Sequence, residues 1–395
     1  MSKPRYTPRE MLARLVGFDT TSALSNLALI EFVEGYLDAW GVPPRRIPNE
    51  DGRKASLLAT VGENRPGGVV LSGHSDVVPV AGQPWSSDPF ALLERDGRLY
   101  GRGTCDMKAF LAIGLALLPE MMARPLRVPL HFAISYDEEV GCTGVGPMIR
   151  LMAKELPPPR AVIVGEPSEM RIVNAHKGIT SHWVHIRGHE AHSSQPHRGA
   201  NANLAAARLV NKLWEMAAAR EARPFPDSGF EPPYSTFNVG VLEGGTANNI
   251  IPRDCKFVFE YRIHPGDSGP EILREFTAFC FGEVEPWLKR HAPEAHIRIE
   301  ERANVPALTA EPDGAAEALL RHLTGSNAVG VVSYATEGGH FQLGGFSTVI
   351  CGPGSIDQAH QPDEFISLAQ LEAGTAFQRR LIAWAQSEAQ AMGGA

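Results

Sequence analysis

The sequence predicts an α/β protein whose main domain is a largely parallel sheet covered by helices, with a smaller domain inserted into it. Three observations support this fold class. Short apolar strands alternate with helices over residues 26–164, the middle of the chain follows a different order of elements, and a buried strand and a long helix resume near the C-terminal end. At roughly 150 residues per domain, 395 residues predict two or three domains.

The first part of the chain supplies a helix and then alternating strands and helices. Apolar residues recur at helical spacing over residues 26–40, and Gly41, Pro43 and Pro44 end that pattern. The elements expected next are a strand at 68–72, a buried helix at 107–123, and strands at 126–135 and 160–164. In such sheets ligands gather beyond the carboxyl ends of the strands, so we expect the functional site there.

The middle of the chain predicts a ferredoxin-like unit of order β-α-β-β-α-β. Its expected elements are a strand at 179–187, a helix at 202–217, strands at 235–241 and 255–263, a helix at 270–290 and a strand at 296–300. A strand at 346–351 and a helix at 368–389 then return to the main domain. We therefore expect a discontinuous catalytic domain of residues 1–178 and 300–395, and an inserted domain of residues 179–299. The inserted sheet offers an outer edge that could pair with a second copy, which predicts a homodimer.

Composition narrows the class of function and the compartment. Lys and Arg number 37 against 45 Asp and Glu, a net charge of -8, which disfavours nucleic-acid binding. The polar start of the chain and the lack of 18 consecutive apolar residues argue against secretion and membrane insertion. Five scattered cysteines without a CxxC pair indicate reduced thiols, so we expect a cytoplasmic protein.

Acidic and imidazole side chains follow strands or glycine-rich turns at five separate places. Any one of them alone is typical of a helix cap, a solvated loop or a structural histidine. Together they supply the mixed nitrogen and oxygen ligands that suit zinc or a similar divalent ion. The residues are His74 and Asp76, Asp106, Glu138 and Glu139, Glu166, and His360.

Spacing adds detail at two of these places. Residues two apart on a strand point the same way, so Asp76 can reach the His74 ring and fix its tautomer. Adjacent Glu138 and Glu139 cannot share a direction if the chain is extended there. One of them can bind metal while the other faces the substrate as a general base.

Other conspicuous residues favour structural roles. His182, His185 and His189 lie on or beside an alternating strand without nearby carboxylate partners, so we expect them on a solvated sheet face. Cys105 precedes Asp106 and is expected to be a small packing residue.

Six segments, in this order along most of the chain, resemble the motifs of the co-catalytic zinc amidohydrolase and peptidase family. They are GHSDVVP, YGRGTCDMKAF, SYDEEVG, GEPSEMRIVNAHKG, GGTANNIIP and TEGGHFQLGGFSTVICGPGSIDQAHQPDEF. Within that family, AHKG and GPGSIDQAHQPDEF are most similar to the acetylornithine deacetylase branch. The resemblance implies a zinc-peptidase-like catalytic domain and an inserted dimerisation domain.

The resemblance also implies roles for the site residues. It implies two zinc ions, with Asp106 as the bridge, His74 and Glu166 completing one site, and Glu139 and His360 completing the other. Glu138 is then the general base. Cobalt and manganese accept overlapping ligand sets and remain possible.

In the inserted domain the resemblance points to three further residues. His192 matches a histidine that relatives contribute across a dimer, where it stabilises the oxyanion. Asn249 and Arg262 match positions that hold the carboxylate end of the substrate. His340 occupies a place where many relatives have a less polar residue, so the substrate pocket is expected to differ.

The implied reaction is metal-dependent hydrolysis of an N-acyl amino acid. N-acetylornithine, cleaved to ornithine and acetate in arginine biosynthesis, is the favoured substrate. The alternatives within the family are succinyl-diaminopimelate, a peptide or another N-acyl amino acid. A metal-stabilised binding protein without turnover is the alternative from another class, and the presence of Glu138 with all five ligands disfavours it.

Overall fold

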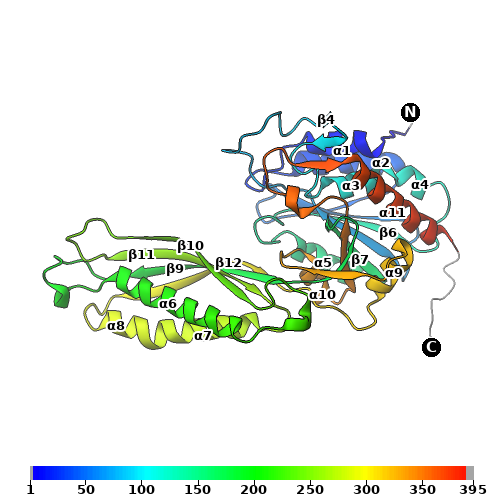
Figure 1. Cartoon of the computed structure of the whole chain (residues 1–395). Helices are drawn as coiled ribbons and strands as arrows, with labels where there is room; N and C mark the ends of the chain where they lie inside the picture. Colours follow the sequence, from blue (N-terminus) through cyan, green and yellow to red (C-terminus); the bar gives the residue numbers. More distant parts are fainter. Residues whose placement is uncertain (1–2, 388–395) are drawn as a thin grey trace. The chain divides into compact units, whose positions relative to one another are not determined.

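The computed structural model describes residues 3–387, and its contacts divide the chain into two compact units (Figure 1). The first unit takes the described residues up to Ala175, Leu308–Gly330, and the described residues from Thr336 onward. The second unit takes His176–Ala307 and Val331–Ala335. The first unit is therefore assembled from segments that are far apart in the sequence.

The largest sheet has eight strands and lies mainly in the first unit. Its order is β1 (Arg45–Pro48), β2 (Ala55–Val61), β6 (Leu130–Ser135), β3 (Val69–His74), β7 (Ala161–Pro167), β14 (Thr348–Gly352), β8 (Ile172–His176) and β13 (Val329–Val332). β3 pairs in parallel with β6 and β7, and β7 pairs in parallel with β14. β2 is antiparallel to both of its neighbours, and β8 is antiparallel to β14. The prediction of a mainly parallel sheet is confirmed at its centre.

Helices and a small sheet complete the first unit. The helices are α1 (Pro8–Val16), α2 (Leu27–Trp40), α3 (Lys108–Ala116), α4 (Leu118–Met121), α5 (Val145–Glu155), α9 (Ala315–Thr324), α10 (Gly338–Leu343), the short η4 (Ile356–Gln358) and α11 (Leu368–Gln386). The small sheet has the order β15 (Phe365–Ser367), β5 (Arg98–Tyr100) and β4 (Leu93–Arg95). No helix among residues 3–387 is both long and apolar enough to cross a bilayer.

Local chemistry explains where these helices begin and end. α2 ends at Gly41, whose φ of 79° is the left-handed conformation that glycine adopts most readily. The helix expected at 107–123 is two helices, because Pro119 lacks the amide hydrogen that would continue α3. Every residue of α3 is buried: after Lys108, whose ammonium group donates to the Leu15 and Phe18 carbonyls, the helix has no charged residue. Residues 388 and 389, expected to end the last helix, lie outside the described residues.

The second unit is a four-stranded antiparallel sheet packed against helices. The sheet order is β10 (Thr236–Gly244), β11 (Asp254–Ile263), β9 (Gly178–Arg187) and β12 (His296–Val305). The helices are η1 (Pro196–Arg198), α6 (Ala202–Glu221), η2 (Pro226–Ser228), α7 (Gly269–Phe279), the π-helical turn η3 (Cys280–Val284) and α8 (Glu285–Lys289). The chain order of the strands and long helices confirms the predicted β-α-β-β-α-β unit. The limits expected from the sequence, 179 and 299, fall inside β9 and β12.

The core of the second unit lies between the sheet and its helices. Val184 and Phe257 contribute from neighbouring strands, and Leu209 and Phe276 contribute from α6 and α7. The helix expected at 270–290 continues through the π turn, which accommodates Pro286 without an amide hydrogen.

The prediction for the histidines near β9 is wrong in two respects. His182 shares a sheet face with Val184, is only 1 % exposed, and stacks on Phe259 with ring centroids 5.3 Å apart. Burial lowers the pKa of His182 to about 4, so its ring is neutral. His185 and His189 do have carboxylate partners, Glu300 at 3.1 Å and Glu294 at 2.9 Å, which approach from segments distant in sequence.

Candidate metal centre

Three parallel strands deliver their carboxyl ends to one edge of the large sheet. β3 ends at His74, β6 leads directly to Glu138 and Glu139, and Glu166 lies near the end of β7. Because β3 is parallel to both neighbours, these side chains meet at the same edge. Asp106 precedes α3, and His360 follows η4. All the candidate ligands therefore belong to the first unit.

Asp106 lies between the two histidines. Its Oδ1 atom is 2.9 Å from His74 Nε2, and its Oδ2 atom is 3.4 Å from His360 Nε2. Glu166 Oε1 is 3.6 Å from His74 Nε2, and Glu139 Oε2 is 3.0 Å from His360 Nε2. A carboxylate that presents one oxygen to each side has the arrangement required of a ligand shared by two ions.

Glu138 also lies among the ligands. His74, Asp106 and Glu139 form one group whose ligand atoms are all within 4.8 Å of one another, and His74, Glu138 and Glu166 form another. The second group includes the residue expected to be the general base. Glu138 is thus close enough to act on a water molecule held by its neighbours.

Asp76 fixes both the first histidine and the loop after β6. His74 Nδ1 donates to the Asp76 backbone carbonyl at 2.9 Å, which leaves Nε2 facing Asp106. The Asp76 carboxylate accepts hydrogen bonds from the backbone N–H groups of Glu138 at 3.2 Å and Glu139 at 3.4 Å. It also accepts a hydrogen bond from the Ser22 hydroxyl at 2.7 Å. The Asp76 Oδ1 atom also lies 3.5 Å from His74 Nδ1, so Asp76 contacts three of the candidate functional residues, His74, Glu138 and Glu139.

Burial and mutual repulsion shift the pKa values of these groups. Burial raises the pKa of Glu138 and Glu166 well above the usual range, helped by the charge of Asp106. Burial and the Asp106 charge raise the pKa of Glu139 to about 7. Burial also acts to raise the pKa of Asp106, but hydrogen bonds from His360 and His74 outweigh it and lower that pKa.

The histidines respond in the opposite direction. Hydrogen bonds to Asp106 and Glu139 raise the pKa of His360 to about 10. Burial works against the charged form of His74, yet its partners Asp106 and Asp76 hold its pKa well above the ordinary value. A cluster with so many crowded carboxylates, and with histidines held close to them, has the donor set and the negative charge that fit divalent cations.

The sequence did not single out two buried acids near this cluster. Glu337 directly precedes α10 and is 1 % exposed, and burial raises its pKa to about 7. Glu364 lies just after His360 and accepts hydrogen bonds from the segment that carries Asp106. The glycine pair after Glu337 and the closeness of Glu364 to His360 in sequence were the available signals. His340, on α10, is half-buried, and burial lowers its pKa.

The three candidates in the inserted segment belong to the second unit. His192 is exposed, its Nδ1 atom lies 2.8 Å from the Ser194 hydroxyl, and its backbone bridges to Ile250. The Asn249 carbonyl accepts a hydrogen bond from the Ser193 N–H at 3.0 Å, so Asn249 lies beside the His192 segment. Arg262 is on β11 and pairs with Glu260, with Nε 3.3 Å from Oε1.

Arg262 and Asn249 lie toward opposite ends of the same sheet. Asn249 is in the loop that leads into β11, which begins at Asp254. At about 3.3 Å per residue, the strand from Asp254 to Arg262 covers about 26 Å. Within one copy of the second unit, these two residues cannot hold the same small molecule.

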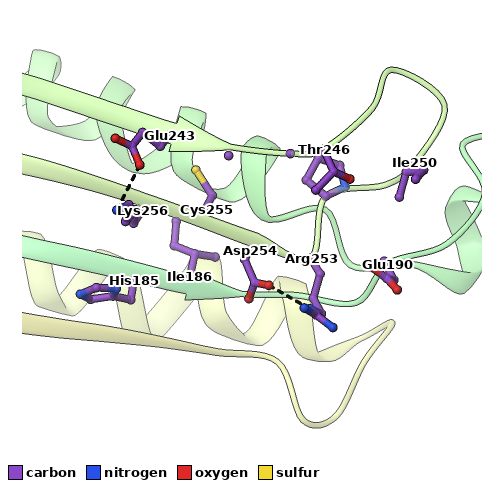
Figure 2. A pocket seen from close by; sticks show the side chains of 13 residues that line it. His185, Ile186, Glu190, Glu243, Thr246, Ile250, Arg253, Asp254, Cys255 and Lys256 are labelled. Carbon is purple, nitrogen blue, oxygen red and sulfur yellow. Dashed lines mark hydrogen bonds and ion pairs between the residues drawn. The ribbon is translucent and has the colours of Figure 1, made fainter.

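A hollow of about 370 Å³ lies at the Asn249 end of this sheet (Figure 2). Two ion pairs line it, Lys256 with Glu243 at 3.0 Å and Arg253 with Asp254 at 2.8 Å. Glu190 adds one carboxylate to these two balanced pairs, whereas the cluster of the first unit gathers Asp106, Glu138, Glu139 and Glu166. The hollow therefore differs in kind from a metal centre.

Comparisons with known proteins identify relatives over nearly the whole chain. The profile of peptidase family M20/M25/M40 matches residues 70–384. Acetylornithine deacetylase from Myxococcus xanthus is 36% identical over 382 residues, covering 95% of this chain and 96% of that protein. The chain is thus similar in sequence and in length to that enzyme.

Solved structures share the fold at low sequence identity. An M20 family metallo-carboxypeptidase from Sulfolobus solfataricus superposes with a TM-score of 0.75 at 16% identity, covering 96% of this chain and 99% of that one. The YXEP protein of Bacillus subtilis, described as a dinuclear metal-binding peptidase of the M20 family, gives a TM-score of 0.62 at 12% identity, covering 95% and 98%. These likenesses support the fold.

Proposed function

Because the chain belongs to peptidase family M20/M25/M40, we propose that it is an amidohydrolase that uses two divalent metal ions to cleave an N-acyl amino acid. The observation that carries this proposal is the position of Asp106, with one carboxylate oxygen directed to each of two histidines. His74 and Glu166 would hold one ion and Glu139 and His360 the other, with Asp106 shared. Zinc suits these nitrogen and oxygen donors, and cobalt or manganese can replace it.

The chain's own residues divide the work of hydrolysis. When bound, the two ions lower the pKa of a water molecule and polarise the amide carbonyl. Glu138 takes a proton from the attacking water and returns it to the leaving amine as the carbon–nitrogen bond breaks. Its carboxylate lies with His74 and Glu166 in a group whose ligand atoms are all within 4.8 Å of one another, so a water molecule held there is within its reach. The products are a carboxylic acid and a free amino acid.

The favoured substrate is N-acetylornithine, which would give acetate and ornithine. Support comes from the similarity in sequence and length to proteins named acetylornithine deacetylase. The alternative is succinyl-diaminopimelate or another N-acyl amino acid or peptide, because the pocket rather than the metal centre sets that preference. His340, on α10, is the residue through which we expect the pocket to differ.

His192, Asn249 and Arg262 are proposed to complete the site in a homodimer. His192 would stabilise the oxyanion, and Asn249 and Arg262 would hold the carboxylate end of the substrate. The separation of about 26 Å along β11 supports contributions from two copies, since one copy cannot bring Asn249 and Arg262 to one ligand. The sheet edges at β10 and β12 are where a second copy could add strands.

Metal analysis followed by a substrate panel tests the reaction. We expect purified protein to contain two divalent ions per chain and to show its highest kcat/KM with N-acetylornithine among acetyl, succinyl and dipeptide substrates. A higher value with a succinylated substrate would favour the alternative. If the protein binds two ions but hydrolyses no amide, the alternative of a metal-stabilised binding protein is favoured.

Mixed dimers test the contribution of a second copy. Glu138→Gln and His192→Ala chains are each expected to be nearly inactive as homodimers. If His192 acts on the neighbouring site, a mixed dimer has one site with both defects and one intact site, so mixing the variants should restore activity. Mixing that restores nothing would place His192 in the site of its own chain. Cytoplasmic location, also proposed, is tested by cell fractionation.

A further inference from the structure

Glu364 joins two segments that carry candidate metal ligands. Its Oε1 atom accepts hydrogen bonds from the backbone N–H groups of Cys105 at 2.8 Å and Asp106 at 3.0 Å. Its Oε2 atom accepts from the Gly103 N–H at 3.1 Å and from Arg102 Nη1 at 2.7 Å. One carboxylate therefore receives four donors from the segment that presents Asp106.

Arg102 balances the charge of this carboxylate inside the protein. Both side chains of the pair are only 1 % exposed. Arg102 Nη1 also lies 3.3 Å from the Gln361 carbonyl, next to His360, and the guanidinium packs over the Trp85 ring at 5.0 Å. A buried ion pair with this many hydrogen bonds fixes geometry, because breaking it leaves an uncompensated charge.

His360 depends on its backbone for its position. Its side chain is 54 % exposed and meets Asp106 and Glu139 at Nε2, and its φ of 63° is in the left-handed region. Gln83 Nε2 donates to the His360 carbonyl at 2.9 Å, and Gln83 Oε1 accepts from Arg102 Nη2. The exposed histidine is thus tied through Gln83 to the same arginine that pairs with Glu364.

We propose that Glu364 is a positioning residue that holds Asp106 and His360 in one rigid arrangement, so that occupancy of the two-ion centre depends on it. The proposal rests on the proposed function, since it concerns the same ions. Glu364 makes no contact with substrate or ion in this scheme. It acts by fixing the peptide that bears the shared carboxylate and the loop that bears the exposed histidine.

The four donors around Glu364 explain why a carboxylate is needed. Both of its oxygens face N–H groups, and a carboxylate offers acceptor sites on both. In Glu364→Gln, the new amide nitrogen would face the Gly103 N–H and Arg102. Because all of these groups are hydrogen-bond donors, both hydrogen bonds would be lost. The substitution changes the charge and the hydrogen bonding while keeping nearly the same volume.

Cobalt titration of the metal-free, full-length protein tests the proposal. Visible absorption reports the number of ions bound and the Kd of each. We expect Glu364→Gln to weaken the binding of at least one ion by about 10-fold to 100-fold, the usual effect of altering a group that orients metal ligands. Gln83→Ala should weaken the binding of one ion by a smaller factor, because it removes only the hydrogen bond to the His360 backbone. The control Glu372→Gln, at an exposed position on α11, should bind both ions as the wild type does.

The outcomes separate this proposal from the proposed function. Unchanged ion number and Kd in folded Glu364→Gln and Gln83→Ala would overturn the positioning role while leaving amide hydrolysis intact. A wild type that binds two ions but hydrolyses no amide would overturn the proposed function while the titration still decides the role of Glu364. If circular dichroism shows that Glu364→Gln is unfolded, Gln83→Ala decides alone, and an unchanged Kd in it overturns the proposal.

Discussion

The candidate functional residues of the two units are held in different ways. In the first unit, His74, Asp106 and Glu166 are buried, and their partners come from several segments of the same unit. In the second unit, His192 and Asn249 are exposed, and their hydrogen bonds join them to the loop residues Ser194 and Ser193. The first arrangement is prepared for chemistry before any ligand arrives. We propose that the second arrangement is completed by another surface, as expected of residues that recognise a ligand or complete a site.

The most direct way to sharpen this comparison is to remove the proposed base from the prepared cluster. We expect Glu138→Gln to lower kcat by about 10²-fold to 10⁴-fold, because the amide cannot accept the proton of the attacking water. The number of bound ions should stay at two. Steady-state kinetics and metal analysis on the same sample measure both quantities. Full activity in the variant would remove Glu138 from the mechanism.

Metal removal should destabilise the first unit more than the second unit. Each ion present at a thousandfold excess over its Kd stabilises the folded chain by about 4 kcal/mol, and a chelator removes the contribution of both ions. Hydrogen exchange should then increase in the segments around Asp106 and Glu139 and stay unchanged in α6 of the second unit. Mass spectrometry of peptides from both units provides the measurement. An equal increase in both units would contradict the distinction drawn between them.

Glu337 tests whether burial in the first unit carries an energetic cost. Its folded pKa of about 7 exceeds the ordinary value of 4.5, so the folded state binds the proton more tightly than the unfolded state does. The resulting stabilisation is complete below about pH 4.5 and is lost as the pH rises to about 7, a change of about 3 kcal/mol. Between these pH values, the free energy of unfolding of the metal-free wild type should fall by about 3 kcal/mol more than that of metal-free Glu337→Gln. Urea unfolding measures both. Parallel curves for the two proteins would show that Glu337 does not titrate with a raised pKa.

The smallest effect is expected on the sheet face of the second unit. His185 and Glu300 are partly exposed, with side-chain exposures of 35% and 41%. Surface pairs of this kind contribute little, so Glu300→Gln should change the free energy of unfolding by no more than about 0.5 kcal/mol. Urea unfolding at pH 6 and pH 8 measures the change. A loss above 2 kcal/mol would contradict the weak contribution expected of this surface pair.

The sequence was informative where local pattern decides the structure. The strand ending at His74 and the strand leading to Glu138 are short apolar runs followed by acids or imidazoles, and parallel pairing brings them to one edge. The exposure of His182 was predicted wrongly, because tertiary packing decides which face of β9 the helices cover.

Other features were invisible for a similar physical reason. Glu364 and Arg102 look like ordinary charged residues in sequence, and only the fold shows that they form a buried pair. The carboxylates opposite His185 and His189 come from residues near position 300 and could not be anticipated from spacing. Propensity and periodicity describe neighbours along the chain, whereas these contacts join distant segments.

The order of the segments along the chain has a consequence for synthesis. His360 and Glu364 follow the whole of the second unit, so they leave the ribosome after nearly everything else. Until then, the nascent first unit carries a crowded group of acids that lacks one of its histidines and the acid that fixes the Asp106 peptide. A transcript cut short after the second unit would therefore yield a polypeptide without a finished ion-binding centre, whatever the fold of its earlier parts.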